Sequence, residues 1–252
     1  IDAFKPMVNN LIKVVEMTGG KIGGLIYNPL ASARAVLTKN QKELGVAAID
    51  IGFGTTSMCV YEEDKLISTA TFPIGSGNIT NDLAIGLRCS IKAAETIKFS
   101  FGSALAKEIS TKEKIDLSQI DEAFKTPVNK RFISEIIEVR LAEIFELVNN
   151  ELKSVGKFGH LPAGAVLTGG GTKIPGIIDL ARQELRLPIQ LGIPDALGVE
   201  FTNGEFESQI EDPQFSSSVG LLLWAGDQTS KDKNWISSGN GLVSKILKYL
   251  LP

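Results

Sequence analysis

Apolar residues follow two spacings along the chain, and together these predict a mixed α/β fold. Continuous apolar runs are typical of buried strands, whereas apolar residues three and four positions apart are typical of helices with one buried face. The runs predict strands over residues 22–27, 46–51, 57–61, 66–73 and 163–168. The helical spacing predicts helices over residues 4–18, from residue 28 onward, and over 79–87, 91–101, 131–155 and 177–185. Residues 107–130 are more polar, so we expect a small inserted subdomain of short strands there.

The apolar run 46–51 ends in a glycine-rich turn with the composition of a phosphate-binding site. The residues in question are Asp50, Gly52, Gly54, Thr55 and Thr56. Glycine adopts backbone angles closed to other residues, so successive N–H groups can point at one anion, and the threonines add hydroxyl donors. Asp50 would instead hold a hydrated Mg²⁺ that bridges phosphate oxygens. A tight β-turn in which glycine serves only the geometry explains the same pattern equally well.

Two further segments carry candidate ligand residues. Glu95 and Lys98 are three positions apart on a predicted helix, so their side chains lie on one face. A surface ion pair is the simpler explanation of that spacing. A second glycine turn joins a predicted strand to a predicted helix and consists of Gly169, Gly170, Gly171 and Thr172. Such a turn lets a flat group approach the backbone beside a helix N-terminus.

Composition narrows the class of protein. The 252 residues are 43% hydrophobic and 22% charged, which predicts a globular chain with a sizeable core and two lobes. The formal net charge of −3 offers no basic excess for binding nucleic acid. The single histidine, His160, excludes a metal site built from several histidines. Cys59 and Cys89 are expected to be free thiols, and no run of 18 apolar residues predicts a membrane-spanning helix.

The last segment predicts a helix that lies on a membrane surface. The polar residues 227–240 are interpreted as a flexible linker. On a helical wheel, residues 241–252 place apolar side chains on one broad arc and lysines on the remainder, and such a helix is too short to cross a bilayer. The membrane-facing set is Leu242, Val243, Lys245, Ile246, Leu247, Lys248, Leu250 and Leu251. Its lysines favour an anionic surface. A terminal helix docked on its own domain is the alternative.

Five stretches of the chain resemble the FtsA family of bacterial cell-division proteins. They read LGVAAIDIGFGTTSMCVY, FPIGSGNITNDLAIGL, KAAETIKFSFGSA, FISEIIEVRLAEIFELVNNEL and AVLTGGGTKIPGI. The family belongs to the actin, Hsp70 and sugar kinase superfamily, so the resemblance implies an actin-like (ribonuclease H-like) lobe with a mixed sheet flanked by helices. It also implies a protein that binds ATP and Mg²⁺, self-associates into filaments, tethers FtsZ filaments to the inner face of the cell membrane, and helps recruit downstream divisome proteins.

The same resemblance assigns roles to the candidate residues. It implies that Asp50 and the turn up to Thr56 hold the phosphates and Mg²⁺, and that Glu95 and Lys98 lie near the ribose and adenine. The second glycine turn would lie against the nucleoside. No catalytic residue is assigned, because the position at which related filament proteins carry a glutamate is Asn28 here, and an amide is no general base. We therefore expect weak or no ATPase activity.

The resemblance also implies a domain organisation. Residues 1–45 would end an incomplete first lobe, 46–102 and 131–226 would form the second lobe, 103–130 would be the inserted subdomain that meets FtsZ, 227–240 the linker, and 241–252 the membrane-targeting helix. The first phosphate loop of the fold is absent from the sequence, so we expect a fragment that lacks the N-terminal part and has an incomplete ATP site. The pilus-assembly protein PilM, and an ATPase of the Hsp70 or sugar kinase type, are the alternatives.

Overall fold

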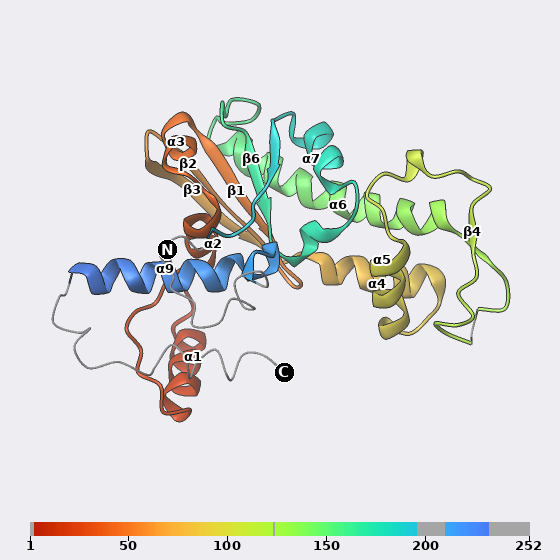
Figure 1. Cartoon of the computed structure of the whole chain (residues 1–252), viewed down its shortest axis with the longest axis horizontal. Helices are drawn as coiled ribbons and strands as arrows, with labels where there is room; N and C mark the ends of the chain where they lie inside the picture. The colour runs from red at the N-terminus through yellow and green to blue at the C-terminus, as the bar shows by residue number, and fades with distance from the viewer. Residues whose placement is uncertain (1–2, 123, 196–209, 232–252) are drawn as a thin grey trace.

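A five-stranded mixed sheet lies at the centre of the computed structural model, which describes residues 3–122, 124–195 and 210–231 (Figure 1). The strands are β1 (Val46–Ile51), β2 (Thr56–Glu62), β3 (Lys65–Phe72), β6 (Ala165–Thr168) and β7 (Ile189–Leu191), in the order β3-β2-β1-β6-β7. β1 pairs antiparallel with β2 and parallel with β6. All six residues of β1 are buried, as its continuous apolar run predicts for a central strand.

Helices cover both faces of the sheet, and the alternation of side chains along β1 shows which residues meet them. On one face, Ile49 belongs to the large core formed with α6 (Lys130–Ser154) and α7 (Ile177–Leu185). On the other face, Ala48 and Cys59 pack against α2 (Asn28–Val36). α9 (Ser216–Lys231) lies along α2 (Figure 1). A Cβ atom on Gly220 would lie under 3.0 Å from the Ala31 carbonyl, so glycine permits this close crossing.

A helical arm extends from one end of the sheet (Figure 1). It contains α4 (Ser76–Leu87), α5 (Ile91–Phe101) and a two-stranded sheet of β4 (Lys114–Ile115) and β5 (Val128–Asn129). The long helix α6 contacts α4 in the arm and α7 over the sheet, so it joins the two parts. The short strands expected in the polar segment are therefore present.

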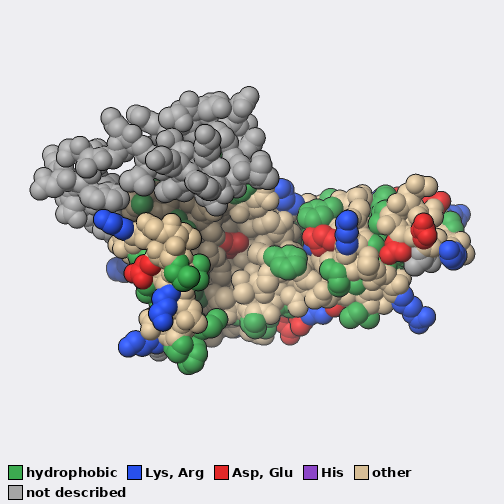
Figure 2. Space-filling view, turned by 90° about the horizontal axis from the view of Figure 1, so that it is seen from below, with side chains coloured by type: hydrophobic (Ala, Val, Ile, Leu, Met, Phe, Trp, Pro, Cys, Tyr) green, Lys and Arg blue, Asp and Glu red, His purple; other side chains and the backbone are tan. Residues whose placement is uncertain are grey.

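The N-terminal helix α1 (Lys5–Met17) buries none of its residues. Apolar side chains of this helix are exposed, among them Met7, Leu11 and Val14, as is the preceding Phe4. Figure 2 shows green hydrophobic side chains at the lower left of this face of the molecule. The remaining short elements are α3 (Lys39–Leu44) and the 3₁₀ turns η1 (Ala106–Glu108), η2 (Gly170–Lys173) and η3 (Pro213–Phe215).

Several predicted elements need correction. The strand expected over 22–27 is wrong, because this segment, which contains Gly23 and Gly24, has no regular structure and no partner strand among the described residues. α4 begins at Ser76, three residues before the predicted start, where the Asn78 side chain accepts from the Gly75 N–H at 3.0 Å. α3 was missed, although its Thr38 and Gln41 form a capping box.

The C-terminal region also differs from the prediction. α9 was missed as a helix, and it continues to Lys231, so the linker predicted from residue 227 is wrong for its first five residues. The predicted membrane helix over 241–252 lies outside the described residues. Within the described ranges, no helix has the length and apolar character needed to cross a bilayer.

Candidate functional site

The turn between β1 and β2 leaves three backbone N–H groups free. The turn is closed by the Gly52 N–H, which donates to the Thr55 carbonyl at 2.9 Å. The carbonyls of Gly52 and Phe53 accept from the first N–H groups of α4, Ser76 at 2.9 Å and Gly77 at 2.8 Å. Because carbonyl and N–H are trans across a peptide bond, the N–H groups of Phe53 and Gly54 point away from α4.

Free N–H groups in one turn have the chemistry to bind an anion. No described residue accepts a hydrogen bond from the N–H of Phe53, Gly54 or Thr55. A Cβ atom on Gly54 would meet nothing within 4 Å, so the space beside the turn is open. Thr55 is exposed, whereas Thr56 is fully buried at the start of β2 and its hydroxyl has no partner among the described residues. A phosphate in the turn would therefore meet the hydroxyl of Thr55 and not that of Thr56.

Asp50 is held at the end of β1 by hydroxyl groups from two helices. Its Oδ2 accepts from Ser32 Oγ of α2 at 2.5 Å, from Ser217 Oγ of α9 at 3.1 Å, and from Asn28 Nδ2 at 3.5 Å. Only 8% of the residue is exposed. Oδ1 faces the second glycine turn, because a Cβ atom on Gly169 would lie under 3.0 Å from it.

One carboxylate oxygen is thus left for a ligand. Within the described ranges no group of three or more His, Cys, Asp or Glu side chains is placed to hold a metal ion. A single carboxylate fits Mg²⁺, which usually keeps several waters and takes few protein ligands, and does not fit a metal that needs a complete protein cage. The free Oδ1 of Asp50 therefore has the chemistry of a ligand to a hydrated Mg²⁺.

The second glycine turn follows β6, which is the parallel neighbour of β1, so the two turns lie side by side. Its glycines are packed inward. Gly169 has φ +89°, and a Cβ atom on either Gly169 or Gly171 would clash with the backbone of Ile51. The Thr172 hydroxyl donates to the Gly169 carbonyl at 2.7 Å, which closes the turn. Only Gly170 is partly exposed, so the turn offers a ligand little more than one peptide edge.

The predicted pair of Glu95 and Lys98 is an ion pair, but it is not a simple surface pair. Lys98 is 3% exposed, and its Nζ donates to Glu95 Oε2 at 2.9 Å, to Thr80 Oγ1 at 2.8 Å and to the Ser76 carbonyl at 3.2 Å. Thr80 also donates to Glu95 Oε2. Lys98 is therefore a positioning residue for Glu95, and no described residue donates to Glu95 Oε1.

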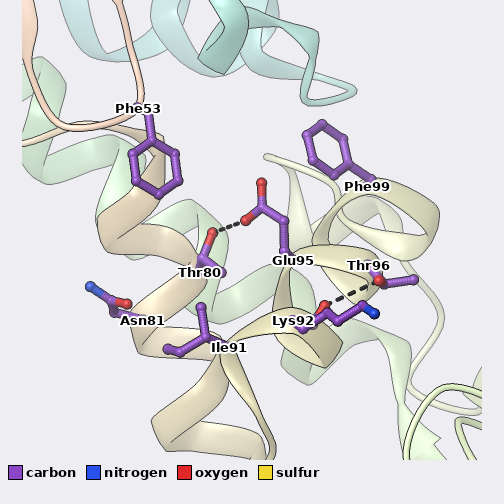
Figure 3. Close-up of a pocket in the computed structure, with 8 residues that line it drawn as sticks. All are labelled: Phe53, Thr80, Asn81, Ile91, Lys92, Glu95, Thr96 and Phe99. Carbon is purple, nitrogen blue, oxygen red and sulfur yellow. Dashed lines mark hydrogen bonds between the residues drawn. The ribbon is translucent and has the colours of Figure 1, made fainter. Parts of the chain in front are cut away.

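A cavity of about 600 Å³ opens beside this pair, between the β1–β2 turn and helices α4 and α5 (Figure 3). Its lining includes Phe53, Thr80, Lys92, Glu95 and Phe99, but not Lys98. Figure 3 shows the Glu95 carboxylate directed into the space between the rings of Phe53 and Phe99. The sequence interpretation missed both rings and Lys92. The signal was present, because Phe53 lies inside the glycine turn and Phe99 directly follows Lys98.

The cysteine beneath α2 has no part in this site. Burial raises the pKa of Cys59 to about 12, although the nearby Lys42 ammonium acts in the opposite direction. The thiol is therefore protonated at neutral pH and inert as a nucleophile. Both cysteines are free, as expected.

Sequence comparison decides the family. A family model described as "Cell division protein FtsA" matches residues 47–220, which is more than half of the chain. The chain belongs to the FtsA family of cell-division proteins. FtsA of Bacillus subtilis strain 168 is 38% identical over 225 residues, which cover 89% of this chain and 48% of that protein. FtsA of Neisseria meningitidis serogroup B is 36% identical over 251 residues, 96% of this chain and 59% of that FtsA. The chain thus spans about half the length of the FtsA relatives it matches.

Solved structures confirm the predicted actin-like fold. MreB5 of Spiroplasma citri bound to ADP has a TM-score of 0.68 at 15% identity, covering 92% of this chain and 68% of MreB5. A chain of the PilM-PilN type IV pilus biogenesis complex has a TM-score of 0.64 at 19% identity, covering 86% of this FtsA-family chain and 56% of that chain. At these identities the likeness establishes the fold alone.

Proposed function

We propose that this chain carries the second-lobe half of an ATP·Mg²⁺ site in an FtsA-type protein. The observation that carries the proposal is the open N–H surface of the β1–β2 turn next to the half-satisfied carboxylate of Asp50. A row of free amides favours an anion, and the neighbouring carboxylate favours a cation that bridges to it. The structural neighbour MreB5 bound to ADP, and its form bound to AMPPNP, support a nucleotide as the ligand.

In this proposal each group has one role. The amides of Phe53 and Gly54 and the hydroxyl of Thr55 bind phosphate oxygens, and Asp50 Oδ1 holds the hydrated Mg²⁺, which neutralises phosphate charge when bound. Glu95 Oε1 accepts from ribose hydroxyls, since its other oxygen is occupied. The turn from Gly169 to Thr172 contributes shape, because it packs closely against the Asp50 carboxylate that Ser32 and Ser217 hold.

We further propose that nucleotide acts as a conformational ligand. Asn28 contacts Asp50 through its amide nitrogen, and an amide does not accept the proton of an attacking water. Binding energy that differs between two conformations then shifts their populations without chemistry. Weak or absent turnover is the expected result of a phosphate-release assay.

The cellular role proposed for the protein follows from its family. Self-association into filaments, docking of FtsZ through residues 103–130, recruitment of divisome proteins and attachment to the anionic inner face of the cell membrane through residues 241–252 are proposals that rest on membership of the FtsA family. The Leu-rich and Lys-containing C-terminal segment supports the attachment, because apolar area and positive charge both favour an anionic interface.

The nucleotide site is tested by measuring ATP affinity with and without Mg²⁺, both for this 252-residue chain and for a longer gene product that contains it. Asp50→Ala should remove the Mg²⁺-dependent part of the affinity. Asp179→Ala, an exposed carboxylate on α7, is the matched control. Equal Mg²⁺ dependence in Asp50→Ala and the control would refute the metal role.

Membrane attachment is tested by sedimentation with anionic and with neutral vesicles. Binding should be stronger to anionic vesicles, weaken with salt, and disappear when residues 241–252 are deleted or when Leu247 and Leu250 are both changed to Glu. Equal sedimentation of the deletion variant would exclude this segment as the anchor.

A further inference from the structure

We propose that Ser217 couples the C-terminal helix α9 to the Asp50 carboxylate, so that binding of a cation at Asp50 loosens the start of α9. This inference rests on the nucleotide site proposed above and adds a means of regulating it. Ser217 acts on that site through its hydrogen bond to Asp50, as a positioning residue.

Ser32, Ser217 and Asp50 form a closed triangle of polar contacts between three elements. Ser32 Oγ of α2 donates to Asp50 Oδ2 at 2.5 Å, and Ser217 Oγ of α9 donates to the same oxygen at 3.1 Å. The two serine oxygens are 2.8 Å apart. Each hydroxyl carries one hydrogen, so two hydrogens serve three contacts. Ser217 therefore has two acceptors within reach, the Asp50 carboxylate on β1 and the Ser32 hydroxyl on α2.

The charge on Asp50 decides which acceptor Ser217 uses. A hydrogen bond to a carboxylate is roughly twice as strong as one between neutral groups, so the Ser217 hydroxyl points to Asp50 while the carboxylate keeps its full charge. Oδ2 becomes a weaker acceptor when part of that charge is drawn to a cation at Oδ1. The Ser217 hydroxyl then turns to Ser32, and the hydrogen bond from α9 to β1 is lost.

The start of α9 is the part of the helix that this change affects. Ser216 contacts the Thr168 hydroxyl at the end of β6 and donates to the Pro213 carbonyl at 2.9 Å, so this turn is seated on the strand ends. The rest of α9 is held against α2 by the close crossing at Gly220 and by the ion pair of Arg34 and Asp227. Loss of the bond to Asp50 therefore loosens the first turn and leaves the remainder of the helix in place.

The coupling must be reciprocal, because a contact that is stronger without the cation lowers the affinity for the cation. Ser217→Ala removes this contact, and should raise the Mg²⁺-dependent part of the ATP affinity about threefold. Ser217→Thr keeps the hydroxyl and should retain the wild-type Mg²⁺ dependence. A role for Ser217 in orienting Oδ1 towards the ligand predicts the opposite sign, a loss of affinity in Ser217→Ala.

The first measurement is ATP affinity with and without Mg²⁺ for the wild type and these variants. Ser216→Ala is the matched control, because it removes a buried hydroxyl from the same turn that contacts Thr168 instead of Asp50. It should lower the free energy of unfolding in urea and leave the Mg²⁺ dependence unchanged. Ser217→Cys, which keeps the size of the side chain but is a weak donor, repeats the test if Ser217→Ala does not fold.

Hydrogen exchange of the backbone amides in residues 213–222 is the second measurement. In the wild type, exchange should be faster with ATP and Mg²⁺ than with ATP alone, and in Ser217→Ala Mg²⁺ should make no difference. Slower exchange with Mg²⁺ in the wild type would overturn the inference.

The outcomes separate this inference from the proposal beneath it. Equal Mg²⁺ dependence of ATP affinity in the wild type and Ser217→Ala, or weaker Mg²⁺-dependent binding in that variant, would overturn the coupling and leave the nucleotide site intact. ATP binding by the wild type that does not depend on Mg²⁺, or no ATP binding at all, would overturn the proposed site and this inference with it.

Discussion

The two glycine turns look alike in sequence, yet they use glycine for opposite physical reasons. The β1–β2 turn faces outward, and its Gly54 has open space where a side chain would be. The turn after β6 faces inward, and its Gly169 and Gly171 allow the backbone to press against Ile51. The first turn leaves N–H groups free for the proposed ligand, whereas the second packs its backbone against Asp50 and Ile51. A glycine-rich motif therefore does not reveal by itself whether its backbone is open to a ligand or packs against the rest of the protein.

The largest effect is expected at the inward turn. Gly169→Ala would place a Cβ at φ +89° against Asp50 and Ile51, combining backbone strain with a steric clash. We expect the free energy of unfolding to fall by about 3 kcal/mol, measured by urea denaturation. A midpoint equal to that of wild type would show that the turn has room to relax and that the contrast between the turns is false.

A smaller loss is expected when the support of Glu95 is removed. Lys98→Met leaves the Thr80 hydroxyl and the Ser76 carbonyl without their buried donor, and should lower the free energy of unfolding by about 1 to 3 kcal/mol. Lys65→Met removes an exposed partner of Glu63 and should change it by less than about 0.5 kcal/mol. Similar changes in the free energy of unfolding for the two variants would mean that the buried hydrogen bonds of Lys98 contribute no more to stability than an exposed ion pair.

Cys59 reports whether damage at the inward turn spreads through the sheet. Its pKa is raised from 9.0 to about 12 by burial, so the unfolded state ionises first and stability should fall as the pH rises from 9 towards 12. Cys59→Ala should reduce this alkaline loss but not abolish it, because burial also raises the pKa of Tyr61 to about 12. At pH 8 a thiol reagent should label Cys89 before Cys59 in wild type, and Gly169→Ala should accelerate labelling of Cys59. An unchanged rate of Cys59 labelling in Gly169→Ala would show that the destabilisation is limited to the turn.

The smallest effect on stability is expected at the outward turn. Gly54→Ala introduces a methyl group into open space, so the free energy of unfolding should change by less than about 0.5 kcal/mol. The same methyl lies beside the proposed phosphate position, and ATP affinity measured by titration should fall. A variant that is destabilised as strongly as Gly169→Ala would show that both turns are structural.

The sequence predicted the elements whose signal is local. β1, α5 and α7 were found at their observed positions because their apolar spacing and caps lie within the segment itself. The direction in which each turn faces could not be predicted, because it depends on partners distant in the chain. The Gly169 N–H donates to the Pro213 carbonyl, and the Phe53 carbonyl accepts from Gly77.

The candidate site shows the same limit. The sequence indicated charged side chains at Asp50, Glu95 and Lys98, and in the structure one oxygen of each of the two carboxylates has no donor among the described residues. Burial of Lys98 was not predictable, since two of its three hydrogen-bond partners, Ser76 and Thr80, lie on the neighbouring helix α4. α9 was missed because small and polar residues stand where it contacts α2, such as Ser217 beside Ser32 and Gly220 beside Ala31, so the segment lacks the apolar spacing of a helix.

The hydrogen bond from Ser217 to Asp50 can form only late in the synthesis of the chain. The two residues are 167 positions apart, so the carboxylate emerges from the ribosome long before its α9 partner exists. β1, β2 and β3 can pair as soon as they emerge, because their contacts are local, whereas the closing of α9 against α2 must be a late and slow step. A nascent chain halted before residue 213 would therefore hold a formed hairpin with an Asp50 that lacks Ser217, one of its hydroxyl donors.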